Sequence, residues 1–163
     1  MIRMHTTLGT IDIELDHAKA PITAKNFEQY VRDGHYDGLI FHRVINNFMI
    51  QGGGYTADMK ERKTRAPIQN EAKNGLGNRV GTIAMARTSA PHSASAQFFI
   101  NVSDNKFLDY PGQDGWGYCV FGRVVDGMPT VEKIKSVATG NRAGHSDVPV
   151  DSVTIERAEV IEG

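Results

Sequence analysis

The chain has 163 residues, 40% of them hydrophobic, which is enough for one globular domain with a buried core. A net charge of −1 excludes a strong electrostatic attraction to nucleic acid or to an anionic membrane. The single cysteine, Cys119, indicates a buried thiol in a reducing compartment, and no apolar run reaches the ~18 residues of a membrane span. We therefore expect one domain over residues 1–163, soluble, cytoplasmic and monomeric.

The first elements are a hairpin and a helix. Apolar and polar residues alternate over residues 2–6 and 11–15, on either side of a turn that contains Gly9. Pro21 suits the first position of a helix, and Gly34 supplies a stop at its C-terminal end. The sequence therefore predicts two strands followed by a helix.

Residues 41–54 combine an arginine, large apolar side chains, an amide and a glycine run, and we interpret this stretch as the active site. The two asparagines at 46–47 tolerate positive φ, which predicts strand, turn, strand. On the second strand, period-2 alternation places Ile50 on one face and both Met49 and Gln51 on the other.

A polar stretch over residues 55–80 predicts a long loop, and its basic residues suit a solvated face. A strand is predicted over residues 82–86 and another over 97–102. In the strand over 97–102, the even-numbered residues are apolar and predict a core face. Phe99 lies on the opposite face, together with the amides Gln97 and Asn101. We expect Phe99 to be an exposed aromatic.

The last elements are a strand over residues 118–124, a second helix that opens at Pro129 and a final strand over 152–161. Residues 139–149 are rich in turn formers and are predicted to form no strand. The result is a mainly β fold with eight strands and two helices. Many antiparallel strands with few helices favour a closed sheet, because closure removes exposed edges.

Five motifs point to one family. They are Phe-His-Arg-Val-Ile at 41–45, Phe-Met-Ile-Gln-Gly-Gly at 48–53, Ala-Met-Ala at 84–86, Gln-Phe-Phe-Ile at 97–100 and Val-Phe-Gly at 120–122. In order and spacing the sequence resembles the cyclophilins, which are peptidyl-prolyl cis/trans isomerases, and is most similar to their small bacterial cytosolic type. The resemblance implies a closed eight-stranded antiparallel β-barrel capped by two α-helices, with the binding groove on its outer wall.

The resemblance also implies an isomerase (EC 5.2.1.8 class) that assists protein folding, acts on proline-containing peptides and on unfolded or flexible chains, and needs no cofactor and no metal. We expect Arg43 to be the catalytic residue, because its guanidinium carries five donors and can bond the proline nitrogen once the amide is twisted. The substrate-binding positions implied are Phe48, Met49, Phe99 and Leu108 for the apolar proline pocket, Gln51 and Gln97 beside the arginine, Ala86, Arg87 and Thr88 along the peptide backbone, and Phe107 and Tyr118 at the pocket edge.

Two of these positions depart from the family pattern. Phe107 stands where the family often has tryptophan, and Tyr118 where it often has histidine. The indole N–H assists cyclosporin binding in family members. The resemblance therefore implies weak cyclosporin affinity with isomerase activity retained.

The same residues allow other interpretations. Without its motif, Arg43 is more typical of a rim charge, and a proline-peptide binding module or chaperone with incidental catalysis is the alternative to an isomerase. A hydrolase built on Ser93 and His92 lacks the Gly-x-Ser-x-Gly elbow. The six histidines show no metal-ligand spacing, and His42 is expected to be a strand residue bonded within the fold.

Overall fold

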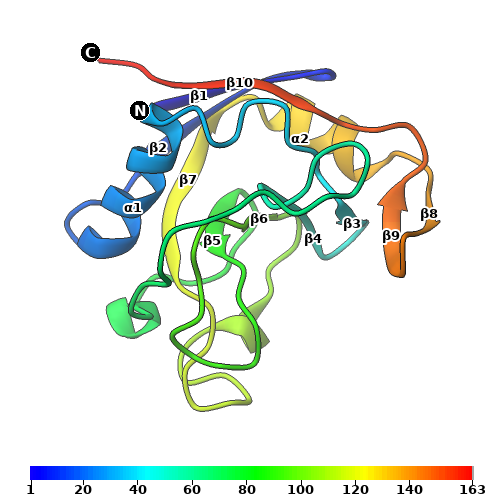
Figure 1. Cartoon of the computed structure of the whole chain (residues 1–163). Helices are drawn as coiled ribbons and strands as arrows, with labels where there is room; N and C mark the ends of the chain where they lie inside the picture. Colours follow the sequence, from blue (N-terminus) through cyan, green and yellow to red (C-terminus); the bar gives the residue numbers. More distant parts are fainter. Residues whose placement is uncertain (163) are drawn as a thin grey trace.

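The computed structural model describes residues 1–162 as a curled antiparallel sheet of eight strands, with two α-helices packed against it (Figure 1). The mainly β fold with two helices is confirmed. Hydrogen-bonded neighbours follow the order β10-β1-β2-β7-β5-β6-β4-β3. The strands are β1 (Ile2–Thr6), β2 (Gly9–Leu15), β3 (Arg43–Ile45), β4 (Met49–Gly52), β5 (Thr82–Met85), β6 (Phe98–Asn101), β7 (Val120–Asp126) and β10 (Ile155–Val160).

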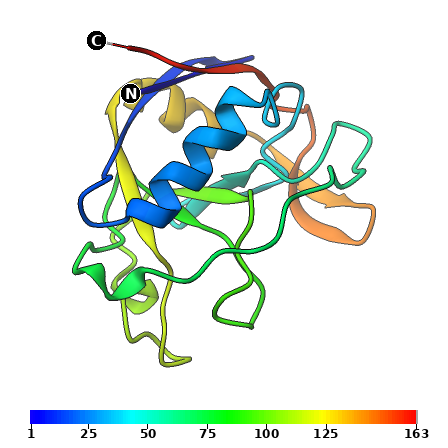
Figure 2. The same cartoon turned by 60° about the vertical axis from the view of Figure 1, so that its left-hand side comes forward.

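The helices α1 (Pro21–Arg32) and α2 (Met128–Lys135) cover different parts of the sheet. α1 begins at the predicted proline and packs against β10 and β7. In Figure 2 this helix (blue) lies below β10 (red). α2 packs against β2, β3 and β4. Two short 3-10 turns, Ala72–Asn74 and Lys106–Leu108, interrupt the long connections. No helix within residues 1–162 has the length and apolar content needed to cross a membrane.

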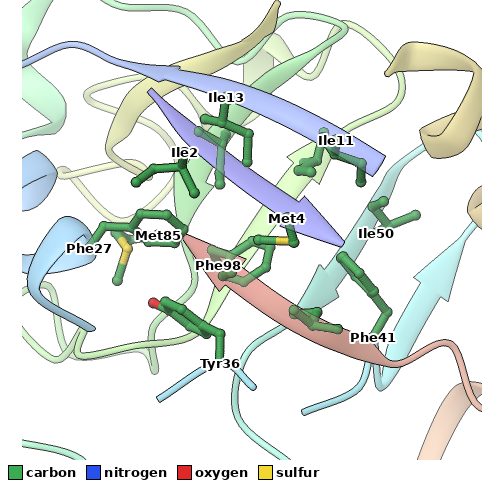
Figure 3. Close-up of a cluster of buried hydrophobic side chains, with 14 of the residues drawn as sticks. Ile2, Met4, Ile11, Ile13, Phe27, Tyr36, Phe41, Ile50, Met85 and Phe98 are labelled. Carbon is green, nitrogen blue, oxygen red and sulfur yellow. The ribbon is translucent and has the colours of Figure 1, made fainter. Parts of the chain in front are cut away.

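The main core lies inside the curl of the sheet. Alternate residues of the strands point inward, so Ile11, Ile13, Ile50 and Phe98 converge with Phe27 of α1 (Figure 3). All five are fully buried. Burying an aliphatic or aromatic side chain of this size is worth about 1.5–3 kcal/mol, so this shared face fixes the register of the strands.

The hydrogen-bonded ladder has β10 at one end and β3 at the other. Between these ends the structure has an isolated bridge from Ile40 to Thr154, flanked by the bonds Phe41 N–H to Val153 O (2.9 Å) and Ile155 N–H to Leu39 O (2.7 Å). The structure thus shows a curled eight-stranded sheet, and its closure into a barrel stays a prediction.

The prediction for residues 139–149 was wrong, because they form a hairpin of β8 (Thr139–Arg142) and β9 (His145–Pro149) that projects at the right of Figure 1. Ala143 and Gly144 both have positive φ at its tip, as a tight hairpin turn requires. Every residue of β8 is exposed. The strand therefore has no apolar face, and its sequence shows no alternation.

Candidate active site

The candidate site contains a row of three residues, one from each of three neighbouring strands. In the register of the sheet, Arg43 of β3 lies opposite Gln51 of β4, and Gln51 lies opposite Phe99 of β6. Neighbours in the pleat, such as Val44 and Ile50, point to the main core. The predicted alternation around Ile50 is confirmed, and it places all three side chains of the row on the outer face.

Two amides hold the arginine. Arg43 Nη1 donates to Gln51 Oε1 at 3.4 Å, and Gln51 Nε2 donates to Gln97 Oε1 at 3.1 Å. Gln97 lies directly over Gly54, where a Cβ would stand 2.5 Å from its side-chain carboxamide carbon. The glycine at 54 thus leaves the space that Gln97 needs in order to fix Gln51.

Arg43 stands at the rim of a hollow of about 230 Å³. The guanidinium is exposed to solvent, whereas Met49, Phe99 and Leu108 in the lining belong to one buried apolar cluster. A polar donor therefore faces a space suited to a small apolar ring. The hollow is lined by Arg43, Phe48, Met49, Gln51, Ala86, Arg87, Phe99, Leu108 and Tyr118.

Phe99 forms the floor of the hollow and is buried, at 4% exposure, so the prediction of an exposed aromatic was wrong. Its outer face is covered by a second apolar cluster that includes Met49, Leu108 and Tyr118. The rings of Phe99 and Tyr118 meet edge to face, with centroids 5.8 Å apart. Because the connection between β6 and β7 folds back over the sheet, both faces of β6 are buried, and strand alternation alone does not indicate this.

A buried asparagine network supports the hollow from below, and no motif in the sequence indicated it. Asn101 donates to Asn78 Oδ1 (3.0 Å), and Asn105 donates both to Asn101 Oδ1 (2.8 Å) and to the carbonyl of Phe48 (2.9 Å). Asn78 in turn donates to Asp109. The network ties the wall residue Phe48 to the loop that carries Leu108. Its one signal in the sequence is Asn101 itself, an amide within a strand.

His42 precedes β3 and is not a strand residue. It is 4% exposed, and its Nδ1 has no hydrogen-bond partner within the part of the chain that the structure describes, so the expected bond within the fold is absent there. Its ring packs against Tyr55, with centroids 4.6 Å apart. Burial, helped by nearby His145 and Arg43, lowers the pKa of His42 to about 4. It is therefore neutral at pH 7. No group of three or more His, Cys, Asp or Glu side chains suited to a metal ion occurs among residues 1–162.

The sequence of residues 1–160 matches the family model described as cyclophilin type peptidyl-prolyl cis-trans isomerase/CLD. The chain belongs to the cyclophilins. It is 58% identical to peptidyl-prolyl cis-trans isomerase cyp18 of Streptomyces antibioticus, over 98% of each chain. It is also 58% identical to peptidyl-prolyl cis-trans isomerase B of Escherichia coli K12, over 99% of this chain and all of that protein. The resemblance to the bacterial type and the isomerase function are thus confirmed.

A solved structure extends the comparison to the fold. The cyclophilin type peptidyl-prolyl cis-trans isomerase of Cryptosporidium parvum, crystallised in the presence of the dipeptide Ala-Pro, superposes with a TM-score of 0.81 over 99% of both chains. Sequence identity with that protein is 26%. The curled sheet described above is therefore a cyclophilin fold.

Most residues predicted for the cyclophilin groove lie around the hollow beside Arg43, but three do not line it. Thr88 and Gln97 line an adjoining hollow, which shares Gln51 with the first. Phe107 is 54% exposed and stacks on Phe48, with centroids 5.8 Å apart. It lines a different hollow on the far side of Leu108. Phe107 thus does not line the hollow beside the arginine, although it contacts Phe48, which does.

Proposed function

We propose that this cyclophilin rotates X-Pro bonds without covalent chemistry, and that Arg43 stabilises the twisted amide. The observation that carries the proposal is the exposed guanidinium of Arg43 at the rim of a hollow of about 230 Å³ that Phe99 and Met49 also line. Its substrates are proline-containing segments of peptides and of folding or flexible chains. The crystallisation of the Cryptosporidium parvum cyclophilin in the presence of Ala-Pro supports this class of ligand.

Rotation about a peptide bond is slow because it breaks amide resonance, at a barrier of about 18–20 kcal/mol. Roughly a thousand turnovers per second need about 5–7 kcal/mol of relief. Only contacts that are stronger in the twisted state lower this barrier. In that state the proline nitrogen regains its lone pair and accepts a hydrogen bond, which the planar amide does not allow.

Arg43 supplies that hydrogen bond. A charge-assisted bond is worth about 1.5–3 kcal/mol net, so the guanidinium provides part of the total. The rest comes from excluding water, which strengthens the contacts made to the twisted amide. Phe99 and Met49 hold the proline ring in place while the other side of the bond turns. Gln51 accepts one donor of Arg43, which keeps the remaining donors aimed over the hollow.

The test is exchange between the cis and trans signals of a proline peptide in NMR at substoichiometric protein. We expect exchange with wild type and a loss of about 10²- to 10³-fold in catalytic efficiency for Arg43→Ala, the range for one preorganised donor. Arg123→Ala is the matched control, since Arg123 is an exposed arginine of β7 that pairs with Glu14. Binding without exchange would indicate a binding module, and full activity of Arg43→Ala would remove Arg43 from this role.

Finer features of the molecule follow as further parts of this proposal. We propose one domain over residues 1–163 and a sheet closed into a barrel by the bonds between residues 38–41 and 153–155. We also propose a cytoplasmic monomer, and the buried free thiol of Cys119 supports the reducing compartment.

A further inference from the structure

Arg87 follows β5 at the edge of the groove, yet its side chain is only 2% exposed. Nη2 donates to Asp114 Oδ2 and to the carbonyl of Gly117, each at 2.6 Å, and Nη1 donates to the carbonyl of Thr88 at 3.0 Å. The guanidinium also lies 4.3 Å from the ring centre of Tyr118. One side chain therefore joins the segment after β5 to the segment before β7.

Asp114 holds that second segment in a tight turn. Its Oδ1 accepts the backbone N–H groups of Trp116 and Gly117, both at 3.0 Å, while Oδ2 accepts Arg87. These donors, led by the Gly117 N–H, lower the pKa of the Asp114 carboxyl to about 2. The carboxylate is therefore charged throughout the neutral range. One of its oxygens accepts hydrogen bonds from the turn backbone, and the other accepts one from Arg87.

Tyr118 separates two hollows. Together with Leu108 and Arg87 it lines both the hollow beside Arg43 and a neighbouring hollow that also contains Asp114. Its N–H donates to the carbonyl of Leu108 at 2.8 Å. Its ring meets Phe99 edge to face and also contacts the Arg87 guanidinium, 4.3 Å from the ring centre. The position of this wall therefore depends on the guanidinium behind it.

We propose that the Arg87–Asp114 ion pair positions Tyr118 as a wall of the proline hollow and so sets the affinity for the proline ring. This inference rests on the proposed function of the hollow. Neither the Arg87 guanidinium nor Asp114 is a catalytic residue; both are positioning residues that act through Tyr118. When the pair is broken, the guanidinium loses its anchor, Tyr118 gains room to move and the two hollows are no longer separated.

A wall contact holds the proline ring in the planar and the twisted states alike, so its loss weakens binding without raising the barrier from the bound state. The variant that isolates the pair is Asp114→Asn. Its side-chain oxygen still accepts the two turn N–H groups, whereas its NH2 group faces the donors of Arg87. We expect KM for a proline peptide to rise by about three- to tenfold, with kcat changed by less than about twofold.

The matched control is Asp33→Asn. It breaks the ion pair between Asp33 and Arg65, which is 2.7 Å long and whose carboxylate is 45% exposed, compared with 39% for Asp114. We expect unchanged kcat and KM for this variant. A merely structural role for Asp114 would lower the melting temperature without the separation of KM from kcat.

An unchanged KM for Asp114→Asn, or a fall in kcat alone, overturns the inference. If this variant does not fold, Arg87→Lys decides, because lysine keeps the charge but loses the planar fork that reaches Gly117 and Thr88. A raised KM then supports the positioning role, and an unchanged KM overturns it. Failure of the catalytic proposal is seen separately, as full activity of Arg43→Ala.

Discussion

Gln51 accepts a hydrogen bond from Arg43 across two paired strands, with 3.4 Å between Nη1 and Oε1. The same amide donates to Gln97, so its orientation is fixed from the far side. A neutral acceptor orients the guanidinium without neutralising its charge. A carboxylate in this place would instead compete with the proline nitrogen for the donors of Arg43.

We predict that Gln51→Leu lowers kcat/KM by about fivefold, because the guanidinium loses the bond that aims it and one hydrogen bond is worth about 1 kcal/mol. The measurement is the isomerisation rate of a proline peptide. Gln29→Leu, at an exposed amide of α1 that bonds Asp33, is the matched control and should leave the rate unchanged. Equal rates for Gln51→Leu and wild type would show that Arg43 is oriented by other contacts.

How far the sequence predicts this molecule depends on whether a residue's role is local. Arg43 and Gln51 lie eight residues apart on two adjacent strands, so alternation and an Asn-Asn turn are enough to place them on one face. Phe99 was misplaced because its cover comes from the β6–β7 connection, which carries no alternation. Asp114 was missed for the same reason, since its partner Arg87 lies 27 residues away in a separate loop.

The asparagine network provides a test of how the hollow is supported. Asn101 is fully buried and bonds Asn78, Thr82 and Asn105, so Asn101→Ala leaves several buried polar groups without a partner. We predict a loss of about 2–4 kcal/mol in the free energy of unfolding, measured by urea denaturation. Asn141→Ala, at an exposed position of β8, should change it by less than about 0.5 kcal/mol. A small effect at Asn101 would mean that water replaces its bonds.

The position of Phe107 bears on cyclosporin. Its ring is 54% exposed, stacks on Phe48 and carries no N–H donor. We predict weak binding of cyclosporin by wild type in a direct titration, and an affinity gain of about tenfold for Phe107→Trp, the value of one added hydrogen bond. Tyr110→Trp adds an indole in the same connection and should bring no gain. A nanomolar dissociation constant for wild type would refute the prediction.

His42 makes stability depend on pH. Its pKa is lowered to about 4 in the folded chain, compared with 6.5 for a solvated histidine, mainly because burial removes the hydration of the imidazolium. Between these values the unfolded chain binds the extra proton, so unfolding becomes easier as the pH falls from 6.5 towards 4. The free energy of unfolding falls by at most about 1.4 kcal/mol per pH unit, and by about 3 kcal/mol in total. Above pH 6.5 the imidazole of His42 is neutral in the folded and the unfolded chain, so it adds no pH dependence to the free energy of unfolding.

We predict that His42→Gln flattens this acid slope, because glutamine binds no proton in either state. The measurement is the free energy of unfolding from urea titrations between about pH 4.5 and about 7.5. His35, whose pKa is also lowered by burial, is present in both proteins, so its share of the slope cancels in the comparison. His17→Gln, at a side chain that is 52% exposed, should keep the wild-type slope. An unchanged slope in His42→Gln would show that the imidazole is not held neutral by the fold.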